Sequence, residues 1–139
     1  MNLKVHLVFA GTCEEALNFY NETLNGKVDF LFRKKEDKDN EVADCDKEKI
    51  SHMVVKTEHF DLAGEDANNG EKVVVGNNNK LVLSFYDLDR CKKVWATFEK
   101  NGTVTMPLQK TFFCEAMGEV TDKYGISWII MMNDDDYSA

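Results

Sequence analysis

With 139 residues, of which 43% are hydrophobic and 30% charged, the chain is long enough for one domain with a buried core and too apolar for a disordered protein. Its net charge of −8 argues against a nucleic-acid partner, because phosphate binding needs clustered Lys and Arg. The one such cluster, residues 33–35, is followed directly by acidic residues. The absence of a signal-peptide pattern and of a long apolar run predicts a cytoplasmic protein with no membrane partner. The four cysteines lack paired spacing, so neither a zinc framework nor disulfides are expected.

The first half of the chain predicts a strand, a helix and three further strands. Apolar residues alternate in the strands, and Thr12 with Glu15 forms a capping-box pattern at the start of the helix, which ends at an Asn-Gly pair. The highly charged residues 34–49 are interpreted as a solvated loop. The expected elements are a strand over residues 4–10, a helix from Thr12 to residues 25–26, a strand over 27–32, and a hairpin of strands over 50–56 and 59–63.

The second half repeats this order after an Asn- and Gly-rich linker over residues 65–80. Its expected elements are a strand over residues 81–86, a helix from residue 88 to the Asn-Gly pair at 101–102, and strands over 103–107, 118–121 and 126–132. The domain boundaries are set at about residues 1–66 for module one, 67–79 for the linker, 80–133 for module two and 134–139 for an acidic tail, all within a single domain.

An internal repeat relates the two halves. A shift of 75 places Ala16 on Cys91 and Tyr20 on Trp95, and a shift of 76 aligns the two Asn-Gly pairs. A duplicated strand–helix–strand unit explains these matches most simply. Because each half alone would bury only one face of a small sheet, we expect the halves to form one curved sheet around a shared cleft.

Three segments resemble the PhnB-like branch of the vicinal oxygen chelate superfamily, which includes glyoxalase and bleomycin-resistance proteins and dioxygenases. They are residues 9–20 (FAGTCEEALNFY), 102–112 (GTVTMPLQKTF) and 120–128 (VTDKYGISW). The resemblance implies an α+β fold of two βαβββ modules, a curved mixed sheet around a cleft that holds a ligand, and a homodimer. Members of this branch often carry the name of a demethylubiquinone methyltransferase. We expect no such activity, because the chain has no glycine-rich turn of the G-x-G-x-x-G type.

Metal-dependent members of the superfamily place His, Gln or Glu ligands on the first and last strands of each half. By this resemblance His6 matches the first ligand, and Asp61, with His59 nearby, lies in the last strand of the first half. In the second half the corresponding residues 81–83 and 128–130 supply no donor. A divalent metal needs three or four donors. A tightly held catalytic metal is therefore not expected, and His6, His52 and Asp61 remain the candidates if a divalent metal does bind.

The candidate ligand-binding residues are His6, His52, Phe112, Phe113 and Cys114. A neutral imidazole at position 52 can act as a polar anchor or a general base, or can be structural. Phe112 and Phe113 can form the aromatic wall of a pocket or cap the core. Cys114 lies next to Glu115, which disfavours a reactive thiolate, so a packing role at the cleft edge is favoured for it.

Two classes of function remain open. In the first, the protein binds a small molecule in the concave cleft without catalysis, which requires only shape, aromatic residues and polar anchors. The alternative is a metal-dependent lyase, isomerase or dioxygenase that uses His6 and His52 together with an unidentified acid. A regulatory or scaffold role for the dimer is a third possibility. The missing donors in the second half favour the binding protein.

Overall fold

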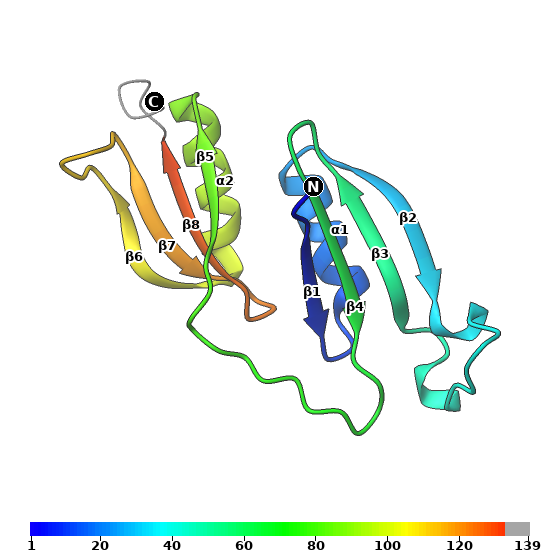
Figure 1. Cartoon of the computed structure of the whole chain (residues 1–139). Coiled ribbons are helices and arrows are strands. Elements are labelled where there is room, and N and C mark those ends of the chain that lie inside the picture. Colours follow the sequence, from blue (N-terminus) through cyan, green and yellow to red (C-terminus); the bar gives the residue numbers. More distant parts are fainter. Residues whose placement is uncertain (133–139) are drawn as a thin grey trace. The chain divides into compact units, whose positions relative to one another are not determined.

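Each half of the chain folds as a strand, a helix and three further strands in the computed structural model, which describes residues 1–132 (Figure 1). The first unit, up to residue 74, contains β1 (Val5–Phe9), α1 (Cys13–Thr23), β2 (Lys27–Arg33), β3 (Ile50–Lys56) and β4 (Asp61–Asp66). The second unit, from residue 75, contains β5 (Leu81–Phe85), α2 (Leu88–Asn101), β6 (Thr103–Gln109), β7 (Met117–Thr121) and β8 (Ser127–Met132). The predicted α+β fold of two βαβββ modules is confirmed, whereas the expected acidic tail lies outside the described residues.

The eight strands form two four-stranded mixed sheets, and the strand order is the same in both. The first sheet has the order β1-β4-β3-β2 and the second the order β5-β8-β7-β6. The first and last strands of each module are parallel neighbours, and the other neighbours are antiparallel. Each module therefore brings its first strand beside its last one, although about 50 residues of chain separate them.

Each helix covers one face of its own sheet and builds a separate core there. The buried stripe of α1 repeats every three or four residues, which is the spacing of one helix face. The same is true of α2, whose residues Cys91, Val94, Trp95 and Phe98 are all buried. Because strand residues alternate between the two faces, every second residue of each strand points away from its helix.

The backbone N–H groups at the start of α1 are hydrogen-bonded by a different side chain from the one that the sequence predicts. Thr12 is the N-terminal cap residue, but its side chain makes no capping hydrogen bond. Instead, the buried carboxylate of Asp66, at the end of β4, accepts hydrogen bonds from the backbone N–H groups of Gly11 (3.0 Å), Cys13 (2.9 Å) and Ile50 (2.9 Å). The predicted capping box was therefore wrong, because a carboxylate distant in sequence accepts from the first N–H group of the helix, that of Cys13.

The charged residues 34–49, predicted as a solvated loop, are an anchored segment. Two short 3-10 helices lie in it, Lys34–Glu36 and Asp44–Asp46. Lys34 is 8% exposed and Asp46 only 4%. The prediction is right for most of the segment, whose residues are largely exposed, but it missed these two charged side chains, which are hydrogen-bonded to residues 68 and 69 beyond β4.

Asp46 gives this anchoring a pH dependence. The N–H of Asn69 and the ammonium of Lys49 both hydrogen-bond the carboxylate and lower the pKa of Asp46. A pKa that is lowered in the folded state stabilises the fold above the ordinary carboxyl pKa of about 3.9, and this stabilisation is lost as the pH falls through the lower, folded-state value. Asp46→Asn is therefore expected to reduce the free energy of unfolding at pH 7 and to differ less from the unmodified chain at pH 3. Urea unfolding at both pH values measures this difference, and an equal difference at pH 3 would contradict the assignment.

Candidate functional site

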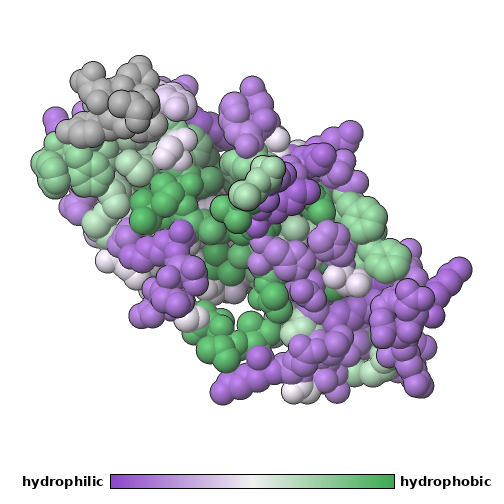
Figure 2. Space-filling model, in the orientation of Figure 1, coloured by the Kyte–Doolittle hydropathy of each residue, from purple (hydrophilic) through white to green (hydrophobic). Residues whose placement is uncertain are grey.

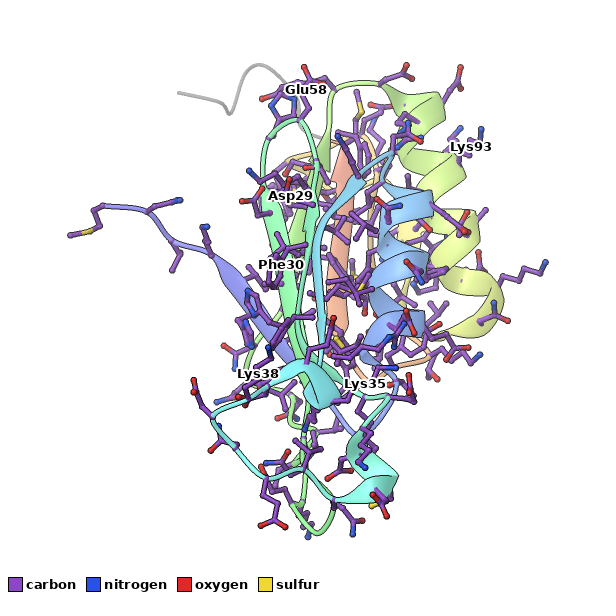
Figure 3. All side chains as sticks on the ribbon, turned by 90° about the vertical axis from the view of Figure 1, so that its right-hand side faces the viewer. Asp29, Phe30, Lys35, Lys38, Glu58 and Lys93 are labelled. Atoms are coloured by element: carbon purple, nitrogen blue, oxygen red, sulfur yellow. The ribbon has the colours of Figure 1, made fainter. Side chains whose placement is uncertain are left out.

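The face of the first sheet turned away from α1 carries the chemically versatile side chains of this unit. Directly paired residues share a face of a sheet. The register pairs His6 with Ala63, Ala63 with Val54, and Val54 with Phe30, so these residues form one row across β1, β4, β3 and β2. Figure 3 shows Phe30 on the side of the sheet opposite the helix. We call this surface the open face.

His6 and His52 are brought together on the open face. Their rings are stacked, with centroids 5.4 Å apart and planes inclined by 13°. They come from strands that are not neighbours, since β4 lies between β1 and β3. The β4 residue opposite His6 is Ala63, whose single methyl group leaves room for the two imidazoles to meet above it.

Glu65 fixes the orientation of His6. Its Oε1 lies 3.0 Å from Nε2 of His6, and a carboxylate only accepts hydrogen bonds, so Nε2 is the donor. In the neutral imidazole this leaves Nδ1 as an acceptor. The side chains of His6 and Glu65 are 38% and 45% exposed, so a bound molecule can reach both of them.

Aromatic rings extend the histidine pair toward the edge strand. Phe30 lies 5.7 Å from the ring of His52 and 6.3 Å from that of Phe32, measured between ring centroids. Phe30 is 48% exposed, which is unusual for so large an apolar side chain. Together, His6, His52, Glu65, Phe30 and Phe32 form what we call the histidine site, which offers polar groups at one end and flat apolar rings at the other.

The other metal candidates of the first unit do not join the histidine site. Asp61 begins β4 and lies on the open face by alternation with Ala63 and Glu65, but its register partner is Lys56 at the far end of the sheet. His59 lies in the turn between β3 and β4, where its side chain is 82% exposed. Neither residue is among the ring or hydrogen-bond contacts of the histidine site.

The remaining predicted ligand-binding residues belong to the second unit, in the connection between β6 and β7. Phe112 is 96% exposed, and Phe113 packs edge to face against it, with ring centroids 5.0 Å apart. Cys114 is buried. Its thiol lies 3.1 Å from the hydroxyl of Thr111 and donates to the carbonyl of Ala116. This hydrogen bonding supports the packing interpretation of Cys114, whereas ligand contact by the two phenylalanines stays a prediction.

Glu65 and Phe30 were missed as site residues by sequence reasoning. The last strand was ended at Ala63, and residues from Glu65 onward were assigned to the linker, but β4 continues to Asp66. The alternation of Asp61, Ala63 and Glu65 was the signal that could have identified the glutamate. Phe30 stands in an edge strand that was correctly predicted, yet its exposure depends on how the sheet is built.

The second unit has apolar side chains at the positions where the first unit has the hydrogen-bonded pair of His6 and Glu65. His6 is the second residue of β1, and the second residue of β5 is Val82. Glu65 is the fifth residue of β4, and the fifth residue of β8 is Met131. The predicted asymmetry between the halves is thus present in the aligned strands.

The resemblance to the vicinal oxygen chelate superfamily implies a divalent metal at side chains such as these. Such an ion needs three or four converging donors. Among residues 1–132, no group of three or more His, Cys, Asp or Glu side chains is placed to hold a metal ion. His6 and Glu65 are hydrogen-bonded to each other, and Val82 and Met131 add no oxygen or nitrogen. The side chains of the described chain therefore do not fit a metal of this kind.

At the start of each helix, a carboxylate of the protein already accepts from backbone N–H groups. At α1, Asp66 already accepts from Gly11 and Cys13. At α2, the side chain of Asp87 accepts from the N–H groups of Asp89 (2.9 Å) and Arg90 (3.2 Å). A nucleotide-binding helix N-terminus instead directs such groups to its ligand.

Comparison with known proteins identifies relatives of the whole chain. A family model described as 3-demethylubiquinone-9 3-methyltransferase matches residues 1–131. Protein YjdN of Escherichia coli (strain K12) is 29% identical over 140 residues, which cover 94% of each chain.

Solved structures share the fold. Protein PA1353 from Pseudomonas aeruginosa matches with a TM-score of 0.86 and 24% identity, covering 96% of this chain and 100% of that one. A Bacillus cereus protein described as a putative 3-demethylubiquinone-9 3-methyltransferase, PhnB protein, matches with a TM-score of 0.81 and 20% identity, covering 95% and 99%. A glyoxylase/bleomycin resistance protein/dioxygenase domain from Frankia sp. EAN1pec matches with a TM-score of 0.68 and 14% identity, covering 96% and 98%.

Within residues 1–132, no helix is both long and apolar enough to span a bilayer.

Proposed function

The chain belongs to the family described as 3-demethylubiquinone-9 3-methyltransferase and has the fold of the glyoxalase/bleomycin-resistance superfamily. On that premise, we propose that it binds a small organic molecule at the histidine site. This membership agrees with the resemblance to the PhnB-like branch that the sequence motifs indicated. The observation that carries the proposal is the stacked pair of His6 and His52 with Glu65 on one imidazole.

The composition of the histidine site determines the kind of molecule that it fits. Phe30, Phe32 and His52 present rings against which a flat apolar group can stack. His6 offers Nδ1 beside them as an acceptor, and Glu65 supplies a carboxylate. A molecule with a planar or aromatic part and a neighbouring polar group matches this arrangement, since pockets for small molecules combine apolar walls with few polar anchors.

Binding at the histidine site is expected to depend on both imidazoles. A thermal-shift screen of metabolites and of aromatic or peptide antibiotics would identify compounds that raise the melting temperature. For such a compound, His6→Ala and His52→Ala are each expected to weaken the affinity at least about tenfold, because each variant loses one hydrogen bond or ring contact with the compound. Isothermal titration calorimetry measures this change.

His59→Ala is the matched control, because it removes an imidazole that is exposed in a turn of the same unit. Its affinity is expected to equal that of the unmodified chain. A broad library without any stabilising compound would contradict the binding proposal, as would compounds whose affinity is the same in His6→Ala and His52→Ala.

Methyl transfer, which the family description names, has less support in this chain. A nucleotide-type methyl donor is commonly held at a glycine-rich turn that leads into a helix. The turn between β1 and α1 contains the single glycine Gly11, and its N–H is bonded to Asp66. The histidine site supports recognition of an organic molecule without such a cofactor.

Metal-dependent catalysis by His6 and His52 is the alternative to simple binding. It has less support because the donors described above do not form a three-donor set. Stoichiometric metal in protein purified without a histidine tag, lost in His6→Ala, would favour this alternative.

The expected homodimer and cytoplasmic location also stay predictions, which sedimentation velocity and cell fractionation would check.

A further inference from the structure

The first unit contains a polar cavity of about 540 Å³ that is lined by the segment of residues 34–49 together with residues 51, 65, 68 and 69. Its volume lies within the range of about 300–1,000 Å³ that is usual for small-molecule sites. Figure 2 shows hydrophilic residues gathered over this segment, at the lower right of the view. The charged and amide side chains that matter for binding are those of Lys34, Asp37, Glu41, Asp46, Glu65 and Asn68.

Lys34 lines the cavity with an incompletely satisfied charge. It is 8% exposed, and its ammonium group donates one hydrogen bond, to Oδ1 of Asn68. An ammonium carries three N–H donors, and the described residues give Lys34 this one hydrogen bond, together with an electrostatic attraction to the carboxylate of Asp46, which is itself bonded to Lys49. Because a buried charge is unfavourable unless it is paired or fully hydrogen-bonded, Lys34 favours a ligand that brings an anionic acceptor.

The rest of the charged lining is acidic. Four carboxylates and the ammonium of Lys34 line the cavity, which leaves a formal charge of −3. Asp46 is paired with Lys49, and Glu65 with His6. Asp37 accepts from the N–H of Asp39 and from the side-chain amide and backbone N–H of Asn40, which are all uncharged donors, so a positively charged group of a ligand would meet Asp37 and the neighbouring Glu41.

We propose that this cavity binds a small zwitterion, with its carboxylate at Lys34 and its ammonium groups at Asp37 and Glu41. The chemical class is a basic amino acid or a short basic peptide, which supplies both charges and matches the net negative charge of the lining. This site goes beyond the histidine site. It shares Glu65 with that site but does not depend on binding there.

L-Lysine and cadaverine test the proposal, because cadaverine is the same diamine without the carboxylate. At low salt, L-lysine is expected to bind the full chain with a Kd of about 1 mM or lower, and cadaverine at least about tenfold more weakly. Glu41→Gln is expected to weaken L-lysine about tenfold, and Lys34→Met to abolish its advantage over cadaverine. Lys38→Met, an exposed change in the same segment outside the cavity lining, is the control and leaves both affinities unchanged.

The proposal would be overturned if L-lysine did not bind up to about 10 mM. It would also be overturned if the unmodified chain bound cadaverine and L-lysine with equal affinity, or if Glu41→Gln and Lys38→Met bound L-lysine with equal affinity. Glu41 is exposed, so its substitution keeps the test valid if Lys34→Met does not fold. His52→Ala, which leaves the pair of His6 and Glu65 in place, is expected to retain L-lysine binding, and this separates failure at the cavity from failure at the histidine site.

Discussion

Replacing Asp66 with alanine is expected to lower the free energy of unfolding of the first unit by about 3–5 kcal/mol. The carboxylate is 2% exposed and accepts from the backbone N–H groups of Gly11, Cys13 and Ile50. Alanine would leave three donors without their acceptor, and each unsatisfied buried donor costs about 1–3 kcal/mol before the structure relaxes. Urea unfolding followed by circular dichroism measures the loss.

Asp29→Ala is the control for this variant. Asp29 stands in the same sheet, but its side chain is 48% exposed and its carboxylate lies 3.7 Å from the ammonium of Lys56. Such a surface pair contributes little, so a change within about 0.5 kcal/mol is expected. A loss below about 1 kcal/mol in Asp66→Ala would contradict the role assigned to Asp66.

Trp128→Ala is expected to destabilise the second unit by about 4–5 kcal/mol. The indole is 1% exposed, its ring centroid lies 5.2 Å from that of Phe98, and its Nε1 donates to Oδ2 of Asp122 at 2.8 Å. Alanine would leave a large cavity under α2 and remove one donor from a buried carboxylate. The same urea unfolding experiment measures this effect.

Trp128→Phe separates the two contributions, because phenylalanine keeps much of the apolar volume but has no N–H. An intermediate loss is expected, about 2 kcal/mol. A loss of stability in Trp128→Ala no larger than that in Trp128→Phe would contradict this role of Trp128, since packing against Phe98 would then contribute nothing.

The order and type of the elements were predictable because they depend on local patterns. The apolar spacing in α2 and the Asn-Gly pairs after both helices are readable from the sequence alone. Asn25 has a φ of 54°, and Gly125, in the predicted turn before β8, has a φ of 90°. Both are backbone conformations that Asn and Gly tolerate best, so these residues mark turns reliably.

The errors arose where contacts distant in sequence decide the structure. β4 continues past Ala63 because Glu65 and Asp66 pair with Val8 and Phe9 of β1, some 57 residues earlier. The same extension positions the Asp66 carboxylate that replaces the expected cap at Thr12. The alternation of Asp61, Ala63 and Glu65 hints at the longer strand, but a local pattern does not show that β1 pairs with it, and Gly64 weakens the strand signal further.

The candidate site was predictable in its parts but not in its assembly. His6 and His52 were each identified as candidates, but their stacking depends on the order β1-β4-β3 and on a small residue between them. Phe112, Phe113 and Cys114 were grouped with them by the expected cleft. They lie in the other unit, so their part in binding remains a separate prediction.

The histidine ring resonances in NMR spectra offer the most direct test of binding at the histidine site. The chain has three histidines, of which His6 and His52 form the stacked pair and His59 lies exposed in a turn. Titration with a compound that raises the melting temperature is predicted to shift the resonances of His6 and His52 together, with one common Kd, and to leave His59 unchanged. A compound that binds while His6 and His52 do not shift, or that shifts His59 equally, would contradict the assignment of this site.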